Sequence, residues 1–258
     1  MTVLLTIPAY NEQDGLPPLL ESFCRTMKAM NLAHRLVICD DGSRDATREV
    51  IESWMNRLPV DVSVHAVNRG LGETIRDALR LALKVAAEDD VIVTMDADNT
   101  HPPELITDML RHIERGSDVV VASRYRPGAR VVGLSRFRHV LSWGARILCQ
   151  VVCPIGGIRD YTCGFRIYRL SVLRRAFEVY GDQLVTERGF SCMTEILVKI
   201  SKLKVRMSEV PLVLRYDQKA GVSKMKVGRT VVSTLKLLIR LRFGESGRIP
   251  RTTRRMVE

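Results

Sequence analysis

Two aspartates, Asp96 and Asp98, are separated by one residue and directly follow the apolar run at 91–95. At the end of an extended strand, residues i and i+2 point to the same side, so both carboxylates can face one point. Neighbouring carboxylates repel each other unless a cation lies between them or they share a proton. Oxygen ligands favour Mg²⁺ or Mn²⁺, which bind through carboxylates together with substrate phosphates. The pair predicts a metal–diphosphate site, with a helix cap as the alternative interpretation.

Polar and acidic residues follow two other apolar runs in the same way. Residues 8–12 (Pro-Ala-Tyr-Asn-Glu) follow the run 3–7, and residues 40–43 (Asp-Asp-Gly-Ser) follow the run 35–39. In parallel α/β sheets, ligands bind beyond the carboxyl ends of the strands, where a carboxylate can hydrogen-bond a base or ribose. No Gly-x-Gly-x-x-Gly follows the first run. This argues against a dinucleotide oxidoreductase and leaves the phosphates to a metal.

The segments that must position these turns alternate between strand and helix. Short β-branched runs predict strands at 3–7, 35–39, 62–66, 91–95 and 119–122. Helical spacing of apolar residues predicts helices at 16–30, 46–58, 71–87 and 103–115. Such alternation is typical of right-handed βαβ units, so we predict an α/β fold with a mostly parallel central sheet flanked by helices.

The second half of the chain has a less regular pattern. It predicts helices at 136–152, 171–180, 187–202 and 226–242, a strand at 205–214, and a tight segment at 160–166. We therefore predict one catalytic domain over 1–226, with a nucleotide-binding half (1–125) and an acceptor half (126–226). A basic amphipathic helix at 227–244 and a mobile basic tail at 245–258 follow it.

The 258 residues include 40 Lys and Arg against 29 Asp and Glu, a net charge of +11. Arginines and apolar residues alternate between 124 and 148, and again in the 227–244 helix, a pattern typical of segments that rest on anionic lipid. No apolar run approaches the roughly 20 residues of a membrane-spanning helix, and no secretory signal is visible. These features predict a peripheral protein on the cytoplasmic face of a membrane.

The sequence argues against two further kinds of protein, a nucleic-acid-binding module and a protein stabilised by disulfides or zinc. A nucleic-acid-binding module would use the positive charge, but it leaves the acidic turns unexplained, and only 5% of residues are aromatic. We therefore expect no nucleic-acid partner. The six scattered cysteines show no Cys-x-x-Cys pair, so disulfides and zinc are not expected, and we predict buried free thiols.

Seven short segments, in this order, carry a family resemblance. They are 8–12, 40–43, 68–72 (Asn-Arg-Gly-Leu-Gly), 95–98 (Met-Asp-Ala-Asp), 123–125 (Ser-Arg-Tyr), 162–166 (Thr-Cys-Gly-Phe-Arg) and 221–224 (Gly-Val-Ser-Lys). Over residues 1–226 the chain resembles the family 2 glycosyltransferases of GT-A fold. Within that family it is most similar to the polyprenyl-phosphate sugar transferases of the dolichol-phosphate mannosyltransferase type.

The resemblance implies an inverting transfer of a hexose, of mannose or glucose type, from a nucleoside-diphosphate sugar to a polyprenyl phosphate, with Mg²⁺ or Mn²⁺. It implies metal ligands at Asp96 and Asp98 and catalytic roles for Asp98, Arg124 and Glu195. The implied acceptor contacts are Arg124, Arg138 and Lys224. The implied donor contacts are Pro8, Tyr10, Glu12, Cys39, Asp41, Asp96, Ala97, Asp98, Arg124 and Lys224.

The chain departs from the family pattern on the sugar and acceptor sides. Gln218 stands where an arginine is expected, with Arg215 and Lys219 nearby, and Met193 replaces a common glutamine. The sequence therefore leaves the donor open between GDP-mannose, UDP-glucose and UDP-N-acetylglucosamine. A glycan or small-molecule acceptor is the alternative, and it would need a general base, for which Glu195 and Asp160 are the candidates. A membrane-anchoring partner subunit is compatible with the sequence but has no signature in it.

Overall fold

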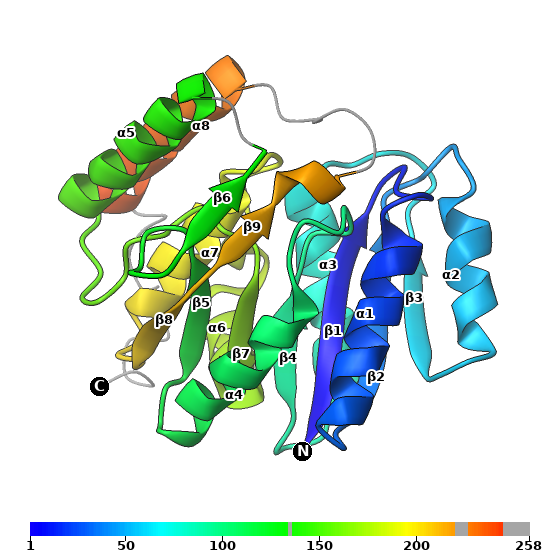
Figure 1. The fold of residues 1–258 in the computed structure, drawn as a ribbon. Coiled ribbons are helices and arrows are strands. Elements are labelled where there is room, and N and C mark those ends of the chain that lie inside the picture. Colours follow the sequence, from blue (N-terminus) through cyan, green and yellow to red (C-terminus); the bar gives the residue numbers. More distant parts are fainter. Residues whose placement is uncertain (134–135, 220–226, 245–258) are drawn as a thin grey trace.

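The computed structural model describes residues 1–133, 136–219 and 227–244. Its centre is a seven-stranded sheet with the order β3-β2-β1-β4-β7-β5-β8 (Figure 1). The predicted mostly parallel sheet is confirmed: only β7 runs antiparallel, to β4 and β5. The strands are β1 (Thr2–Ala9), β2 (Ala33–Asp40), β3 (Val60–Val64), β4 (Val91–Thr94), β5 (Val119–Ser123), β7 (Arg166–Arg169) and β8 (Met207–Pro211).

Helices cover both faces of this sheet. Helices α1 and α4 lie on one face, and α3, α6 and α7 lie on the other (Figure 1). The central strands are buried on both sides, which is why their sequences are continuous apolar runs. The helices are α1 (Leu16–Ala29), α2 (Thr47–Met55), α3 (Leu71–Val85), α4 (Ile106–Glu114), α6 (Leu170–Tyr180) and α7 (Cys192–Ser201), with short 3₁₀ turns η1 (Pro103–Leu105) and η2 (Gly181–Leu184).

The second half of the chain contributes strands to the same sheet as the first half. Strand β7 lies between β4 and β5, and β8 pairs with β5 at the edge. Strand β7 was not predicted, because its first residue, Arg166, belongs to the tight 160–166 segment and its partner strands β4 and β5 are distant in the sequence. The two predicted halves thus share one sheet and one core.

Two predicted elements of the second half are wrong in extent. The strand predicted at 205–214 is two strands, because the chain leaves the large sheet at Pro211, which lacks an N–H, and forms β9 (Val213–Arg215) beside β6 (Arg130–Val132). The helix predicted at 187–202 begins at Cys192. The preceding residues instead hydrogen-bond to Glu195 and pack against α3.

Helices α5 (Arg136–Val152) and α8 (Val227–Phe243) lie side by side outside the sheet layers (Figure 1). Helix α8 also contacts α7, which ties the pair to the main domain. None of the helices in the described ranges is long and apolar enough to cross a membrane. All six cysteines are buried and unpaired, so the prediction of free thiols is confirmed.

Candidate active site

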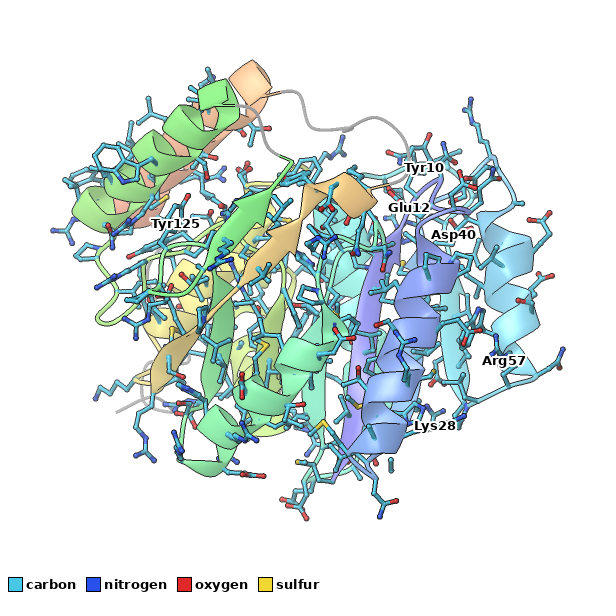
Figure 2. The ribbon with its side chains drawn as sticks, viewed as in Figure 1. Tyr10, Glu12, Lys28, Asp40, Arg57 and Tyr125 are labelled. Atoms are coloured by element: carbon cyan, nitrogen blue, oxygen red, sulfur yellow. The ribbon has the colours of Figure 1, made fainter. Side chains whose placement is uncertain are left out.

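The turns after β1 and β2 are joined by hydrogen bonds into one unit. Asn11, held at a positive φ of 51°, donates its amide N–H to Oγ of Ser43 at 2.9 Å and accepts from the amide of Arg44 at 2.8 Å. The amide of Glu12 donates to Oγ1 of Thr47 at 2.7 Å. Figure 2 shows Tyr10, Glu12 and Asp40 at the same end of the sheet, as their sequence positions predict. Pro8 and Tyr10 are half-buried there.

The acidic pair lies in a turn beyond β4, since this strand ends at Thr94. The strand alternation invoked from the sequence therefore does not orient the pair; hydrogen bonds and close packing do. Oδ1 of Asp98 accepts from the amide (3.2 Å) and hydroxyl (2.7 Å) of Thr100, and Oδ2 accepts from Nζ of Lys219 at 2.5 Å. The Asp96 side chain is 42% exposed. A Cβ at Gly164 would lie 2.9 Å from its Oδ1, so glycine there makes room for the carboxylate.

The two carboxylates differ in electrostatic environment. Surrounding protein atoms displace water from Asp96 and so raise the pKa of its carboxyl. His101 opposes this increase, and the negative charge of Asp98 adds to it. Burial also acts on Asp98, but His101 and the ammonium of Lys219 outweigh it and lower the pKa of that carboxyl. His101 lies behind the turn, with Nε2 at 4.0 Å from Oδ2 of Asp96. The turn thus concentrates negative charge where cationic groups already gather.

Asp96 and Asp98 fit a hard divalent cation, because they offer carboxylate oxygens on one turn. The described part of the chain contains no cluster of three or more His, Cys, Asp or Glu side chains arranged for a metal. A cation at this turn would therefore complete its coordination with oxygens of a substrate or water. Ala97, between the two aspartates, is 3% exposed, and its carbonyl would lie 2.9 Å from a Cβ at Gly15.

Asp41 and Cys39 lie deep among the candidate donor residues. Asp41 is 2% exposed and accepts hydrogen bonds from His65 Nδ1 (2.7 Å) and from the amides of Arg69 (2.8 Å) and Gly70 (2.9 Å). Cys39, two residues earlier in the sequence, is fully buried, and burial raises the pKa of its thiol to about 12. The structure thus gives Asp41 a clear role in holding the 69–70 turn, and its contact with a nucleoside stays a prediction.

Arg124 forms a two-bond ion pair with Asp160. Its Nε and one terminal nitrogen each lie 2.7 Å from an Asp160 oxygen, and the terminal nitrogen also donates to Thr162. Asp160 is fully buried; despite this burial, Arg124 lowers the pKa of its carboxyl. Burial alone would lower the pKa of the Arg124 guanidinium. The negative charge of Asp160 more than offsets this effect, so the pKa of Arg124 is raised. Asp160 is therefore held ionised as the partner of a cation, not presented as a base.

Glu195 is also fully buried. Its carboxylate accepts from the amides of Thr186 (2.8 Å) and Glu187 (2.9 Å), from the Thr186 hydroxyl (2.6 Å) and from Nζ of Lys199 (2.6 Å). These contacts fix the loop before α7, whose Glu187 and Arg188 carbonyls pack on the first turn of α3. The predicted catalytic role of Glu195 stays a prediction, and the observed contacts are those of a positioning group.

The sequence left open which basic residue replaces the arginine expected at Gln218. Arg215 is paired with Asp217 at 2.8 Å and is 42% exposed, whereas Lys219 reaches Asp98. The segment is held over the acidic turn, because the amide of Arg215 donates to the carbonyl of Thr100 at 3.0 Å. Lys219 is thus a site residue that the sequence reading named only as a neighbour. Of the predicted acceptor contacts, Lys224 and the side chain of Arg138 (in α5) lie outside the described part of the structure.

Comparisons with known proteins show the family and the fold of the chain. The model of the family "Glycosyl transferase family 2" matches residues 5–177. The chain is 33% identical to a dolichol-phosphate mannosyltransferase of Pyrococcus furiosus over 93% of its own length and 64% of the relative's. It is 31% identical to an undecaprenyl-phosphate mannosyltransferase of Micrococcus luteus, over 92% and 93%. The chain thus spans somewhat less than two thirds of the Pyrococcus protein and nearly all of the Micrococcus one.

Solved structures share the fold. Glucosyl-3-phosphoglycerate synthase from Mycobacterium tuberculosis, solved with Mn²⁺, UDP and glucosyl-3-phosphoglycerate, superposes with a TM-score of 0.62 at 18% identity, over 92% of this chain and 78% of that one. S. aureus TarS 1–349 with UDP-GlcNAc gives a TM-score of 0.55 at 18% identity, over 96% and 69%. The predicted GT-A fold is confirmed, and the chain belongs to glycosyl transferase family 2.

Proposed function

We propose that the protein transfers a hexose, of mannose or glucose type, from a nucleoside-diphosphate sugar to a polyprenyl phosphate. The observation that carries the proposal is the Asp96–Asp98 turn at the carboxyl end of the sheet, next to the joined turns of β1 and β2. Relatives above 30% identity are named as mannosyltransferases of dolichol and undecaprenyl phosphates, which supports this acceptor class. Pro8, Tyr10, Glu12 and Asp41 then serve the nucleoside.

Asp96 and Asp98 would hold Mg²⁺ or Mn²⁺, which when bound supplies positive charge to the departing diphosphate. The chain adds charges of its own around this turn. Lys219 contacts Asp98, and Arg124 is close enough to influence the pKa of Asp96. These cations would offset the repulsion between an anionic donor and an anionic acceptor, and they would orient both. Arg138 and Lys224 stay proposed acceptor contacts.

The chemistry of the buried acids favours a phosphate nucleophile over a sugar hydroxyl. A lipid phosphate is already ionised near neutral pH, whereas a hydroxyl must lose a proton to a base. The two acids that the sequence offered for this role are Asp160 and Glu195. Both are fully buried and bound to cations, Asp160 to Arg124 and Glu195 to Lys199. A glycan acceptor would thus lack the base that these residues were expected to provide.

The α5–α8 pair presents apolar side chains to solvent, which supports a peripheral place on a membrane. Basic residues accompany them, including Arg240 and Arg242 in the last turn of α8. A surface that combines exposed apolar groups with cations suits the headgroup region of an anionic leaflet, here the cytoplasmic one. The exposed apolar residues are Trp143, Ile147, Val151, Val231, Val232, Leu235, Ile239 and Phe243.

The transfer is tested with purified protein, Mn²⁺, a short polyprenyl phosphate and a panel of GDP-mannose, UDP-glucose and UDP-N-acetylglucosamine. Mass spectrometry should detect one glycolipid, and Asp98→Ala should reduce its formation at least 100-fold. Asp89→Asn changes an exposed acid that precedes β4, at the opposite end of this strand from the turn, and should leave the rate unchanged. Full turnover by Asp98→Ala, or glycosylation of a free sugar in place of the lipid, would overturn the proposal.

The membrane surface is tested separately by sedimentation with vesicles. Wild-type protein should bind vesicles containing anionic phosphatidylglycerol and bind neutral vesicles less well. Trp143→Glu with Phe243→Glu should abolish binding, since both side chains are exposed at 57% and 74%. Val64→Glu, an exposed apolar residue on β3, is the matched control and should bind as wild type does.

A further inference from the structure

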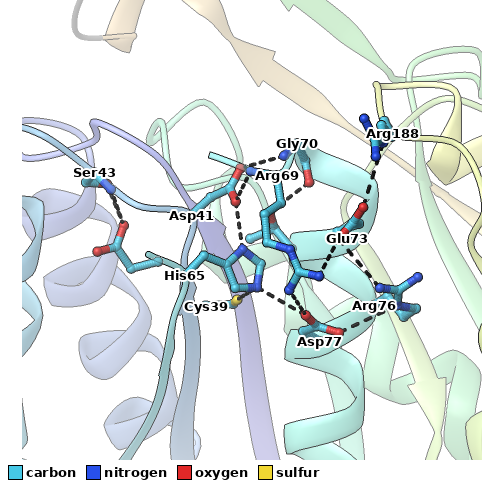
Figure 3. A network of polar contacts seen from close by, with 12 residues as sticks. Cys39, Asp41, Ser43, His65, Arg69, Gly70, Glu73, Arg76, Asp77 and Arg188 are labelled. Carbon is cyan, nitrogen blue, oxygen red and sulfur yellow. Dashed lines mark hydrogen bonds and ion pairs between the residues drawn. The ribbon is translucent and has the colours of Figure 1, made fainter. Parts of the chain in front are cut away.

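A buried histidine bridges two carboxylates behind the proposed donor site. His65 follows β3 and is 7% exposed. Its Nδ1 lies 2.7 Å from Oδ1 of Asp41, and its Nε2 lies 3.1 Å from Oδ2 of Asp77 in α3 (Figure 3). The amide of His65 also donates to the carbonyl of Asp40 at 2.8 Å, which fixes the backbone beside β2. The imidazole thus joins the end of β2 to helix α3.

Both ring nitrogens face carboxylate oxygens, which restricts how the ring can serve them. Nδ1 serves Asp41 and Nε2 serves Asp77, and the Sγ atom of Cys39 lies 3.6 Å from the same Nε2 (Figure 3). Other charges complete the cluster: Arg69 contacts Asp77 at 3.5 Å and Glu73 at 2.8 Å (Figure 3). His65 therefore bridges two acids, with one ring nitrogen facing each carboxylate.

The Asp41 end of this bridge organises the turn before α3. Besides His65, Asp41 accepts from the amides of Arg69 and Gly70. Gly70 adopts a φ of 97°, which favours glycine, so the turn has one specific shape that Asp41 stabilises. At Gly42, beside Asp41, an added Cβ would lie 2.8 Å from the carbonyl carbon of Val67, so the two turns are in close contact. A rotation of the Asp41 carboxylate would disturb both.

A carboxylate can accept about four hydrogen bonds, and those from His65 and the two amides account for three. Asp41 thus keeps acceptor capacity for a ligand while its orientation is fixed from behind. A histidine that merely filled space would need one partner. This one spans two elements and contacts a residue proposed to bind the donor.

We propose that His65 is a positioning residue of the donor site: it fixes the Asp41 carboxylate and the 69–70 turn in the orientation that receives the nucleoside. The inference rests on the proposed function, since it presumes a nucleotide donor at Asp41. It assigns the two halves of the ring different importance. The Nδ1 bond to Asp41 controls nucleotide affinity, and the Nε2 bond to Asp77 contributes to anchoring the ring.

Two substitutions separate these halves. The side-chain amide nitrogen of asparagine approximates the position of Nδ1, and that of glutamine approximates Nε2. His65→Asn can therefore keep the bond to Asp41, whereas His65→Gln keeps the bond to Asp77. Calorimetry with UDP and GDP in the presence of Mn²⁺ should show a Kd within threefold of wild type for His65→Asn and at least tenfold weaker for His65→Gln. In transfer assays the donor KM should follow the Kd, with kcat changed less than threefold.

The controls address folding and the choice of residue. His112→Asn removes a half-buried imidazole whose Nδ1 lies 2.9 Å from Oγ of Ser208 on β8, away from this site, and it should not alter nucleotide affinity. Thermal melting of each variant shows whether it is folded. Equal Kd values for wild type, His65→Asn and His65→Gln would overturn the positioning role. So would equal weakening of both variants in proportion to lost stability. If wild-type protein binds no nucleoside diphosphate at all, the proposed function itself fails.

Discussion

The ammonium of Lys219 lies 2.5 Å from Oδ2 of Asp98, so one member of the acidic pair has a cation within the chain as its partner. The contact joins residues 121 positions apart and brings the segment after β9 to the Asp96–Asp98 turn, which we propose to bind metal. Burial lowers the pKa of the Lys219 ammonium, but the charge of Asp98 outweighs this effect and raises the pKa. The carboxylate of Glu12 is close enough to raise it further. Three segments of the chain thus meet at one charge cluster.

This ion pair predicts that Lys219 competes with a divalent cation. Without nucleotide, Lys219→Gln should bind Mn²⁺ about three- to tenfold more tightly, because a like charge beside the ligands is removed; tenfold corresponds to about 1.4 kcal/mol. Electron paramagnetic resonance of free Mn²⁺ during a titration measures the change. Lys84→Gln, an exposed lysine on α3, should bind as wild type does. Unchanged or weaker binding by Lys219→Gln would contradict a competing role.

Glu195 and Lys199 allow a test of whether Glu195 acts on the substrate or on the structure. Burial lowers the pKa of Lys199, so its charge depends on the Glu195 carboxylate. Glu195→Gln should reduce the free energy of unfolding by about 3–5 kcal/mol, the range for breaking one partner of a buried pair. Glu195→Gln with Lys199→Met should regain part of the loss. Urea unfolding measures both. A group in contact with the reacting sugar behaves differently: kcat would fall 100-fold or more while stability stayed at the wild-type value.

The sequence predicted the parts of the site that depend on strand ends. The 8–12, 40–43 and 95–98 turns follow apolar runs, and the common direction of parallel strands brings them to one edge, as the structure shows. Local patterns carried this information, because period and turn residues are properties of short segments.

Contacts between distant segments were beyond such patterns. The bond from Lys219 to Asp98 and the bridge from His65 to Asp77 each depend on how separate elements pack. Strand β7 was missed for the same reason, since its pairing with β4 and β5 spans long stretches of chain. Glu195 is a different case: its position in the family pattern predicts a catalytic role, which stays a prediction, and its four local contacts could not be read from the sequence.

Asp160 predicts a specific dependence of stability on pH. The charge of Arg124 overcomes burial and lowers the pKa of this carboxyl in the folded state. The folded protein therefore binds fewer protons at Asp160 than the unfolded chain does, since an aspartate in an unfolded chain has a pKa of about 3.9. The ion pair contributes fully above about pH 5, and its contribution declines as the pH falls through the lowered folded pKa.

Asp160→Asn should accordingly be less stable than wild type at pH 7. Below about pH 5 its free energy of unfolding should fall less steeply with decreasing pH, by a slope that corresponds to roughly one proton. Urea unfolding at a series of pH values measures this slope. Asp118→Asn, which removes a partly exposed carboxylate 3.7 Å from Arg169, is the control variant for the loss of a surface ion pair. Parallel curves for wild type and Asp160→Asn would show that Asp160 is not the titrating group.

Gly72, in the first turn of α3, predicts a steric link between the loop before α7 and the donor side of the sheet. A Cβ atom at this position would lie 1.7 Å from the carbonyl oxygen of Glu187, so no side chain fits here unless the backbone moves. Gly72→Ala should therefore displace this loop, lower the free energy of unfolding by about 1–3 kcal/mol and weaken nucleotide binding several-fold. Gly144, inside α5, has no atom within 4 Å of the corresponding Cβ position, so Gly144→Ala should be neutral or stabilising by up to about 1 kcal/mol. Thermal unfolding measures the change in stability, and calorimetry with UDP measures the change in nucleotide affinity. If the two variants have the same stability and the same affinity, the close contact between Gly72 and Glu187 influences neither.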